Sequence, residues 1–161
     1  MKDTAELFAS LDALKARLDA HRPLPADIVS QIRQDMRIRF TYHSNAIEGN
    51  TLTMSETKAV LEDGITIGGK SLREHLEAVG HSQAIDYLEV LAQGDAALTE
   101  RTLKDFHSLI LRNIDGANAG TYRRVNVLIS GAGHIPPQAE SVPEKMEAFF
   151  RWYGAARGAL H

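Results

Sequence analysis

The sequence predicts a mainly α-helical protein that carries one small β-hairpin, and three patterns support this prediction. Apolar residues recur at intervals of three and four through most of the chain, which is the spacing of one helix face. A serine or threonine is followed three positions later by glutamate at three places, a pattern typical of helix starts. In contrast, residues 122–129 are rich in β-branched side chains and are followed by glycines and prolines, which indicates strand and turn.

The chain's length and composition exclude several classes of protein. Its 161 residues suit one domain with a proper core. The net charge is −3, and Arg33, Arg37 and Arg39 are interleaved with apolar residues, so DNA binding is not expected. The absence of cysteine excludes disulfides and thiolate metal sites. Without a signal-peptide pattern or an apolar run long enough to span a membrane, a soluble cytoplasmic protein is expected.

Two helices are predicted before residue 50. The first covers residues 4–20 and ends before two prolines, and the second begins near Pro25 and continues to residue 48. Each has an apolar stripe; the residues are Leu7, Leu11, Leu14 and Leu18 in the first helix, and Ile28, Ile32, Met36 and Phe40 in the second.

Capping patterns predict the starts of the later helices. Capping boxes are expected at residues 53–56, 71–74 and 141–144, and Thr99 is expected to cap a further helix. Gly64 and Gly94 are expected to end the first two of these four helices. The last helix carries an aromatic cluster, which we interpret as core: Phe149, Phe150, Trp152 and Tyr153.

The end of the second predicted helix holds a candidate functional pair. Ser44 and Glu48 are four residues apart and therefore share a helix face. Gly49 is suited to the left-handed conformation that ends a helix. Because the helix macrodipole disfavours a carboxylate at this end, Glu48 calls for a cation from elsewhere in the fold. The same spacing is also common by chance, so a solvated turn residue is the alternative.

Three segments in order resemble the Fic family, in particular its subgroup with an inhibitory helix before the catalytic core. Residues 44–49 look like the inhibitory motif, and residues 77–84 look like an early core helix. Residues 119–131 with 134–137 are similar to the family's flap hairpin. The resemblance implies a Fic-like helical bundle. Residues 1–50 would hold the N-terminal helices, and residues 51–161 the N-terminal part of the core, with a flap at about 120–137.

One departure from the family concerns the chemistry. The signature His-Pro-Phe, acidic residue, Gly-Asn-Gly, Arg does not occur in these 161 residues, and no glycine-rich loop follows His161. No catalytic residue is therefore assigned. The other histidines lack paired-ligand spacing, so no metal site is assigned either. The exposed apolar face expected on the last helix suggests that the native protein continues beyond His161.

The resemblance implies a regulatory role for the 44–50 segment. Family members typically transfer AMP from ATP to a protein hydroxyl, with Mg²⁺ as cofactor. Glu48 would pair with an arginine of the missing signature and thereby block productive ATP binding, while Ser44 orients the carboxylate and Asn50 braces the turn after Gly49. Neither ATP nor Mg²⁺ is expected to bind tightly to this chain alone.

The resemblance also implies a docking role for the flap. Val127 and Ile129 would form an edge that pairs with an extended segment of a target protein, or of another copy of the chain. Tyr122 is expected to pack beneath that edge, Arg123 is a candidate phosphate contact, and His134 belongs to the closing part of the motif. A homodimer is left open, as is the identity of the target.

Two other functions are compatible with the sequence. The first is a non-enzymatic, antitoxin-like module whose Glu48 inhibits a separate Fic enzyme in trans; the presence of a flap favours the transferase over this reading. The second lies within the enzyme class, since some family members remove AMP or transfer a different phosphate-containing group.

Overall fold

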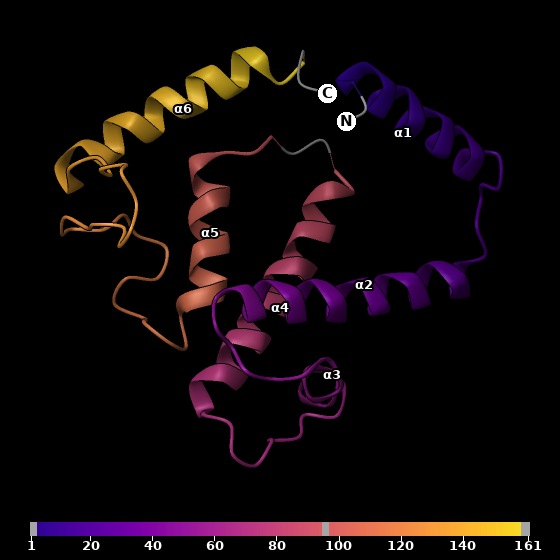
Figure 1. Cartoon of the computed structure of the whole chain (residues 1–161), viewed down its shortest axis with the longest axis horizontal. Coiled ribbons are helices and arrows are strands. Elements are labelled where there is room, and N and C mark those ends of the chain that lie inside the picture. The colour runs from indigo at the N-terminus through magenta and orange to yellow at the C-terminus, as the bar shows by residue number, and fades with distance from the viewer. Residues whose placement is uncertain (1–2, 95–96, 159–161) are drawn as a thin grey trace. The chain divides into compact units, whose positions relative to one another are not determined.

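The computed structural model describes residues 3–94 and 97–158, and the regular structure in these residues is helical. In chain order (Figure 1) the elements are α1 (Thr4–Asp19), α2 (Ala26–Ile47), α3 (Met54–Glu62), α4 (Leu72–Ala92), α5 (Glu100–Leu111), the 3₁₀ turn η1 (Ala139–Ser141) and α6 (Val142–Ala156). The predicted helical class is confirmed. No helix within the described ranges has the length and apolar character that crossing a membrane requires.

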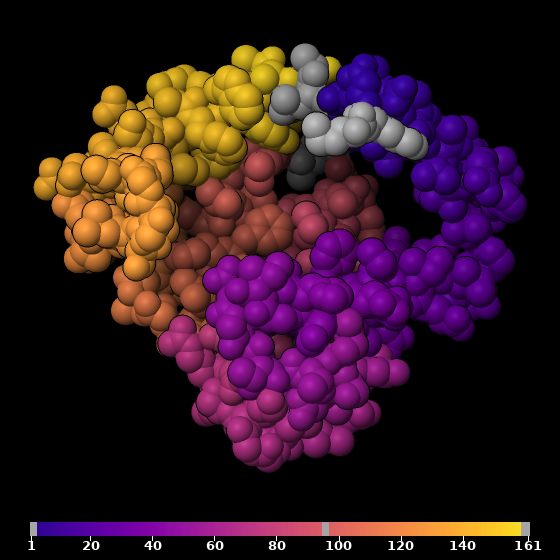
Figure 2. All heavy atoms as spheres, in the orientation of Figure 1, coloured from indigo at the N-terminus to yellow at the C-terminus, as the bar shows by residue number. Residues whose placement is uncertain are grey.

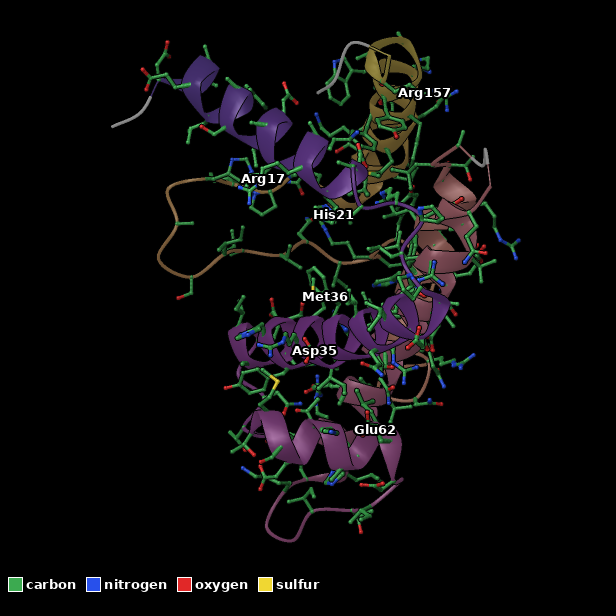
Figure 3. All side chains as sticks on the ribbon, turned by 90° about the vertical axis from the view of Figure 1, so that its right-hand side faces the viewer. Arg17, His21, Asp35, Met36, Glu62 and Arg157 are labelled. Carbon is green, nitrogen blue, oxygen red and sulfur yellow. The ribbon has the colours of Figure 1, made fainter. Side chains whose placement is uncertain are left out.

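Contacts divide the chain into two units, residues 1–37 and residues 38–161, so the boundary falls inside α2. The first unit contains α1, which buries none of its residues. Local interactions stabilise its end: Lys15 and Arg22 pair with Asp19 at 2.9 and 3.0 Å, and the His21 Nδ1–H donates to the Arg17 carbonyl at 2.8 Å (Figure 3). The leucine stripe of α1 is exposed.

The core of the second unit is small and lies between α3 and α4. Leu52, Val60 and Ala78 are buried together, with Ile67 and Val79 packed against them. Helix α4 also packs closely against α5, as Figure 1 shows. This core holds in place the turn that follows α2.

Two of the three predicted capping boxes are confirmed, and the third is wrong. The Thr53 and Ser71 side chains accept from the Glu56 and Glu74 amides, and both glutamates bond back to the cap residue. Ser141 instead has helical backbone angles, φ −88° and ψ −7°, and makes no capping bond. Because η1 precedes α6 directly, Ser141 lacks the extended backbone that a capping side chain needs.

The predicted β-hairpin in the flap, residues 120–137, is not seen. Within the described chain these residues contain a turn at 130–131 but no strand. Across the turn the Ala132 amide donates to the Ile129 carbonyl at 3.2 Å, and Pro136 and Pro137 donate no amide hydrogen near the base of the flap. The chain therefore reverses direction without forming a ladder.

Candidate inhibitory segment and flap

Helix α2 ends in a Schellman motif that determines where Glu48 lies. The Asn50 amide donates to the Asn45 carbonyl at 2.9 Å, and the Gly49 amide donates to the Ala46 carbonyl at 3.1 Å. Gly49 adopts φ +92°, a left-handed conformation that glycine reaches without strain. Glu48 is thus the last residue before the reversal, and it is exposed.

The carboxylate of Glu48 is available to a group outside this chain. Within the described ranges it forms neither an ion pair nor a hydrogen bond, and no hydrogen bond joins it to Ser44. Ser44 is only partly exposed, one turn earlier on α2. Since a carboxylate at a helix C-terminus faces the negative end of the macrodipole, a cation would be favoured beside it.

Asn50 anchors the turn to α4. Its side chain is 9% exposed. The amide nitrogen donates to the Glu74 carbonyl at 3.0 Å and to Glu77 Oε2 at 3.1 Å, while the amide oxygen accepts from the Leu52 amide at 3.0 Å. The side chain thus connects the turn both to α4 and to the segment that leads into α3. The bonds to α4 join residues more than twenty positions apart, which no local sequence pattern indicates.

Glu74 holds the next residue of the turn. Its carboxylate accepts from the Thr51 hydroxyl at 2.6 Å and the Thr51 amide at 2.9 Å, and from the Ser71 amide and hydroxyl, each at 2.8 Å. These donors, the Thr51 hydroxyl first, lower the pKa of Glu74 to about 2. The capping box predicted the Ser71 half of this network, whereas the Thr51 half depends on tertiary structure.

The low pKa of Glu74 leads to an acid-stability prediction. Because the folded chain favours the ionised form, the unfolded chain takes up protons first as the pH falls below 4.5. Stability from Glu74 is therefore complete above that pH and is lost progressively towards about 2. We expect the thermal midpoint to fall across this range, and to fall less in Glu74→Gln. The control Glu89→Gln lies on the same helix outside this network; equal pH slopes in all three proteins would contradict the prediction.

A second contact joins the last turns of α2 to α4. The fully buried Thr41 hydroxyl lies 3.1 Å from His81 Nδ1, and the Asn45 side chain donates to the Thr41 carbonyl at 2.9 Å. Burial lowers the pKa of His81. His81 lies within the segment that resembles a core helix, but neither its contact with Thr41 nor the burial of Thr41 was predicted.

Side chains close the base of the flap in place of a strand ladder. Arg123 donates to the Val125 carbonyl at 2.8 Å and also to the Pro137 carbonyl. The Asn126 side-chain oxygen accepts from the Ala139 amide at 2.8 Å. The Arg123 guanidinium is therefore a structural tie between the two arms of the flap. Asn126 performs the same function and was missed, since nothing in its local sequence distinguishes it.

The tip of the flap presents apolar side chains to solvent. Val127, Leu128 and Ile129 are 42%, 83% and 54% exposed, and Ile135 on the returning arm is 73% exposed. His134, beside it, is exposed as well. Figure 2 shows this segment, in orange, at the left-hand edge of the molecule. The segment is thus apolar and exposed, and its Ile129 carbonyl accepts from the Ala132 amide at 3.2 Å.

Tyr122 packs at the root of the flap against α5. The Lys104 ammonium lies 4.4 Å from the centre of the Tyr122 ring and pairs with Glu100 at 2.6 Å. Burial, and after it the neighbouring Glu100 carboxylate, raises the pKa of the Tyr122 phenol. The chain enters this region through Gly120, whose φ is +71° and whose amide donates to His107 Nδ1 at 3.0 Å. Leu103, His107, Leu111, Tyr122 and Val142 help to line a cavity of about 620 Å³ between α5, residues 118–125 and α6.

The described residues offer no fit for the cofactors that the family resemblance implies. They contain no cluster of three or more His, Asp or Glu side chains that could hold a metal ion. Their glycine-containing turns also lack the phosphate-binding signature. We therefore derive no catalytic step from these residues.

Comparison with known proteins identifies the family, although no protein-family model matches the sequence. The chain is 34% identical over 145 residues to a protein adenylyltransferase Fic from Nematostella vectensis. It is also similar to a crystal structure of a Fic-domain-containing signaling protein from Bacteroides thetaiotaomicron, with a TM-score of 0.84, 26% identity and 93% of this chain covered. The chain belongs to the Fic family.

The Fic relatives are longer than the region they share with this chain. The match covers 88% of this chain but 34% of the Nematostella protein, and 58% of the Bacteroides chain. A Fic-1 structure from C. elegans gives the same picture: its TM-score is 0.70 at 27% identity, and the match covers 92% of this chain and 45% of that one. The chain thus spans about a third of the length of the curated relative.

Proposed function

We propose that this chain is the regulatory and target-docking part of a Fic-type protein adenylyltransferase, in which Glu48 controls productive ATP binding. The observation that carries the proposal is the exposed, unpaired Glu48 carboxylate, placed at a fixed turn immediately before a left-handed glycine. Such a carboxylate can form a charge-assisted pair with an arginine. An arginine so occupied could not bind the γ-phosphate of ATP.

The anchoring of the turn supports this proposal. An inhibitory group must keep its position to compete with a nucleotide, because each freely rotating bond lowers its effective concentration. Asn50 and Glu74 bind the residues after Glu48 to α4, and Thr41 binds the helix before it to the same element. Glu48 therefore projects from a segment that is fixed on both sides.

The flap supplies the second half of the proposed function. An extended target peptide could pair with the backbone of its exposed apolar segment, Val127 to Ile129, in a manner that needs no particular target sequence. The Ile129 carbonyl would be excluded from this pairing, because it accepts from the Ala132 amide at 3.2 Å. The ties made by Arg123 and Asn126 leave this segment projecting from the unit. A protein with a Ser, Thr or Tyr hydroxyl in an extended segment is the proposed partner.

ATP should not stabilise the 161-residue chain. A ligand raises the thermal midpoint only if the folded state has a site for it, and the phosphate-binding signature is absent from this sequence. We expect equal midpoints with and without millimolar ATP and Mg²⁺, measured by scanning calorimetry. A clear upward shift would place a nucleotide site within these residues and contradict the proposal.

The native gene decides between the transferase and the antitoxin-like alternative. If its reading frame continues past the codon for His161 into the catalytic signature, the gene product should transfer label from α-labelled ATP to a protein. If a stop codon follows directly, the transferase proposal falls, and Glu48 has to be tested on a separate Fic enzyme.

A further inference from the structure

The cavity at the root of the flap lies outside both the inhibitory segment and the exposed tip of the flap. Its volume is about 620 Å³, and it is lined by α5, residues 118–125 and the start of α6. Most of its wall is apolar, with Leu103, Leu111, Val125 and Val142 among the lining residues. Leu103 and Val125 are 36% and 68% exposed, so the cavity opens to solvent. A space of this size and character suits a small organic molecule.

The charged side chains that line the cavity are all cations. Lys104, Arg123 and Arg124 contribute to its wall, whereas none of its lining residues in the described part of the chain is an aspartate or a glutamate. Lys104 is already paired with Glu100 at 2.6 Å. The two arginines form no ion pair within the described ranges. The cavity therefore carries uncompensated positive charge in a chain whose net charge is −3.

Two lining residues also keep hydrogen-bond donors for a ligand. Arg123 donates to the Val125 carbonyl at 2.8 Å and to the Pro137 carbonyl, which uses only part of its fork of N–H groups and leaves its charge in place. The Gly120 amide donates to His107 Nδ1 at 3.0 Å, so the hydrogen of the neutral ring is on Nε2. The cavity thus combines apolar walls with donors and cations.

We propose that this cavity binds a small amphipathic anion. The apolar body of the ligand occupies the space between α5 and α6, and its carboxylate or phosphate group meets Arg123 and Arg124. A guanidinium matches either group with two parallel hydrogen bonds. The walls stabilise the body by removing it from water, while the arginines select the sign of the charge. ATP is not such a ligand, because most of its surface is polar.

The experiment titrates the 161-residue chain with two fluorescent probes that share one apolar body. Anilinonaphthalenesulfonate carries an oxyanion, and N-phenylnaphthylamine is the same molecule without it. We expect the sulfonate to bind at one site with a Kd on the order of tens of micromolar, and the neutral probe to bind at least about tenfold more weakly. In NMR spectra, the sulfonate should cause its largest amide shifts at Gly120, Thr121 and Val125.

Three variants test which residues form the site. Arg124→Gln should weaken the binding of the sulfonate by roughly threefold to tenfold and leave the neutral probe unaffected. Leu103→Trp introduces a larger side chain into the cavity and should weaken the binding of both probes. Arg73→Gln is the matched control and should change neither affinity, because Arg73 pairs with Glu77 on α4 and does not line the cavity.

Several results would overturn the proposal. Equal affinity for the two probes would show that the arginines play no part, and the absence of saturable binding would exclude the site altogether. Largest shifts on the leucine stripe of α1 or on the exposed aromatic side chains of α6 would place the probe on a different apolar surface. Should Leu103→Trp fail to fold, the shifts in the parent chain decide the location.

None of these measurements involves Glu48 or ATP. The cavity proposal and the proposed function can therefore fail separately.

Discussion

Replacing Glu48 by glycine should raise AMP transfer by roughly a hundredfold in a gene product that contains both this region and the catalytic signature. A desolvated charge pair contributes about a few kcal/mol, and the substitution would remove this stabilisation from the inhibited state. The affinity for ATP should rise in parallel, because the arginine freed from Glu48 becomes available to the γ-phosphate. Transfer of label from α-labelled ATP measures the first effect, and calorimetric titration with ATP measures the second.

Charge and flexibility can be separated at this position. Glu48→Gln keeps the size of the side chain and removes its charge, so it should activate nearly as well as Glu48→Gly if the pair with arginine is responsible. Glu147→Gln, which breaks an exposed pair with Arg151 on α6, is the matched control and should leave the rate unchanged. An unaltered rate in both Glu48 variants, with the fold intact by circular dichroism, would eliminate the inhibitory role.

Replacing Gly80 by alanine should destabilise the second unit by about 2–3 kcal/mol, because helices α4 and α5 cross at this residue. A Cβ on Gly80 would lie 2.8 Å from the Ile110 carbonyl oxygen and 3.0 Å from the Leu109 carbonyl oxygen. Both are backbone atoms and cannot turn aside, so one helix would have to shift. Thermal unfolding should show a midpoint lower by roughly 5–10 °C.

The opposite sign is expected for a glycine in open surroundings. Gly154 lies within α6, and a Cβ there would meet no atom within 4 Å. Gly154→Ala should therefore stabilise the chain by up to about 1 kcal/mol through helix propensity alone. A neutral or stabilising effect of Gly80→Ala on the thermal midpoint would contradict the close approach of α4 and α5 at this residue.

Local patterns predicted the elements well, because local interactions determine them. The capping boxes at Thr53 and Ser71 place a hydroxyl and a carboxylate within the same turn, so the sequence alone indicates both helix starts. Gly49 is similar, since the end of α2 depends on the conformation of one residue. Ser141 shows the limit: the same pattern fails where a preceding 3₁₀ turn changes the backbone of the cap residue.

In the flap, local strand propensity did not predict the structure correctly. The run from Tyr122 to Ile129 favours a strand, but a strand also needs a partner, and no strand forms in residues 120–137. The closing contacts come instead from Arg123 and Asn126, which reach residues more than ten positions away. A pattern read over a few residues does not contain that information.

By itself, the sequence determined the helical class, most helix limits and the family resemblance, since each depends on residue order over short ranges. Only the tertiary structure decided what holds the turn after Glu48 in place: the bonds from Asn50 to α4 and those from Thr51 to Glu74. These contacts join separate elements, and their energies depend on distances and burial that exist only after the chain has folded.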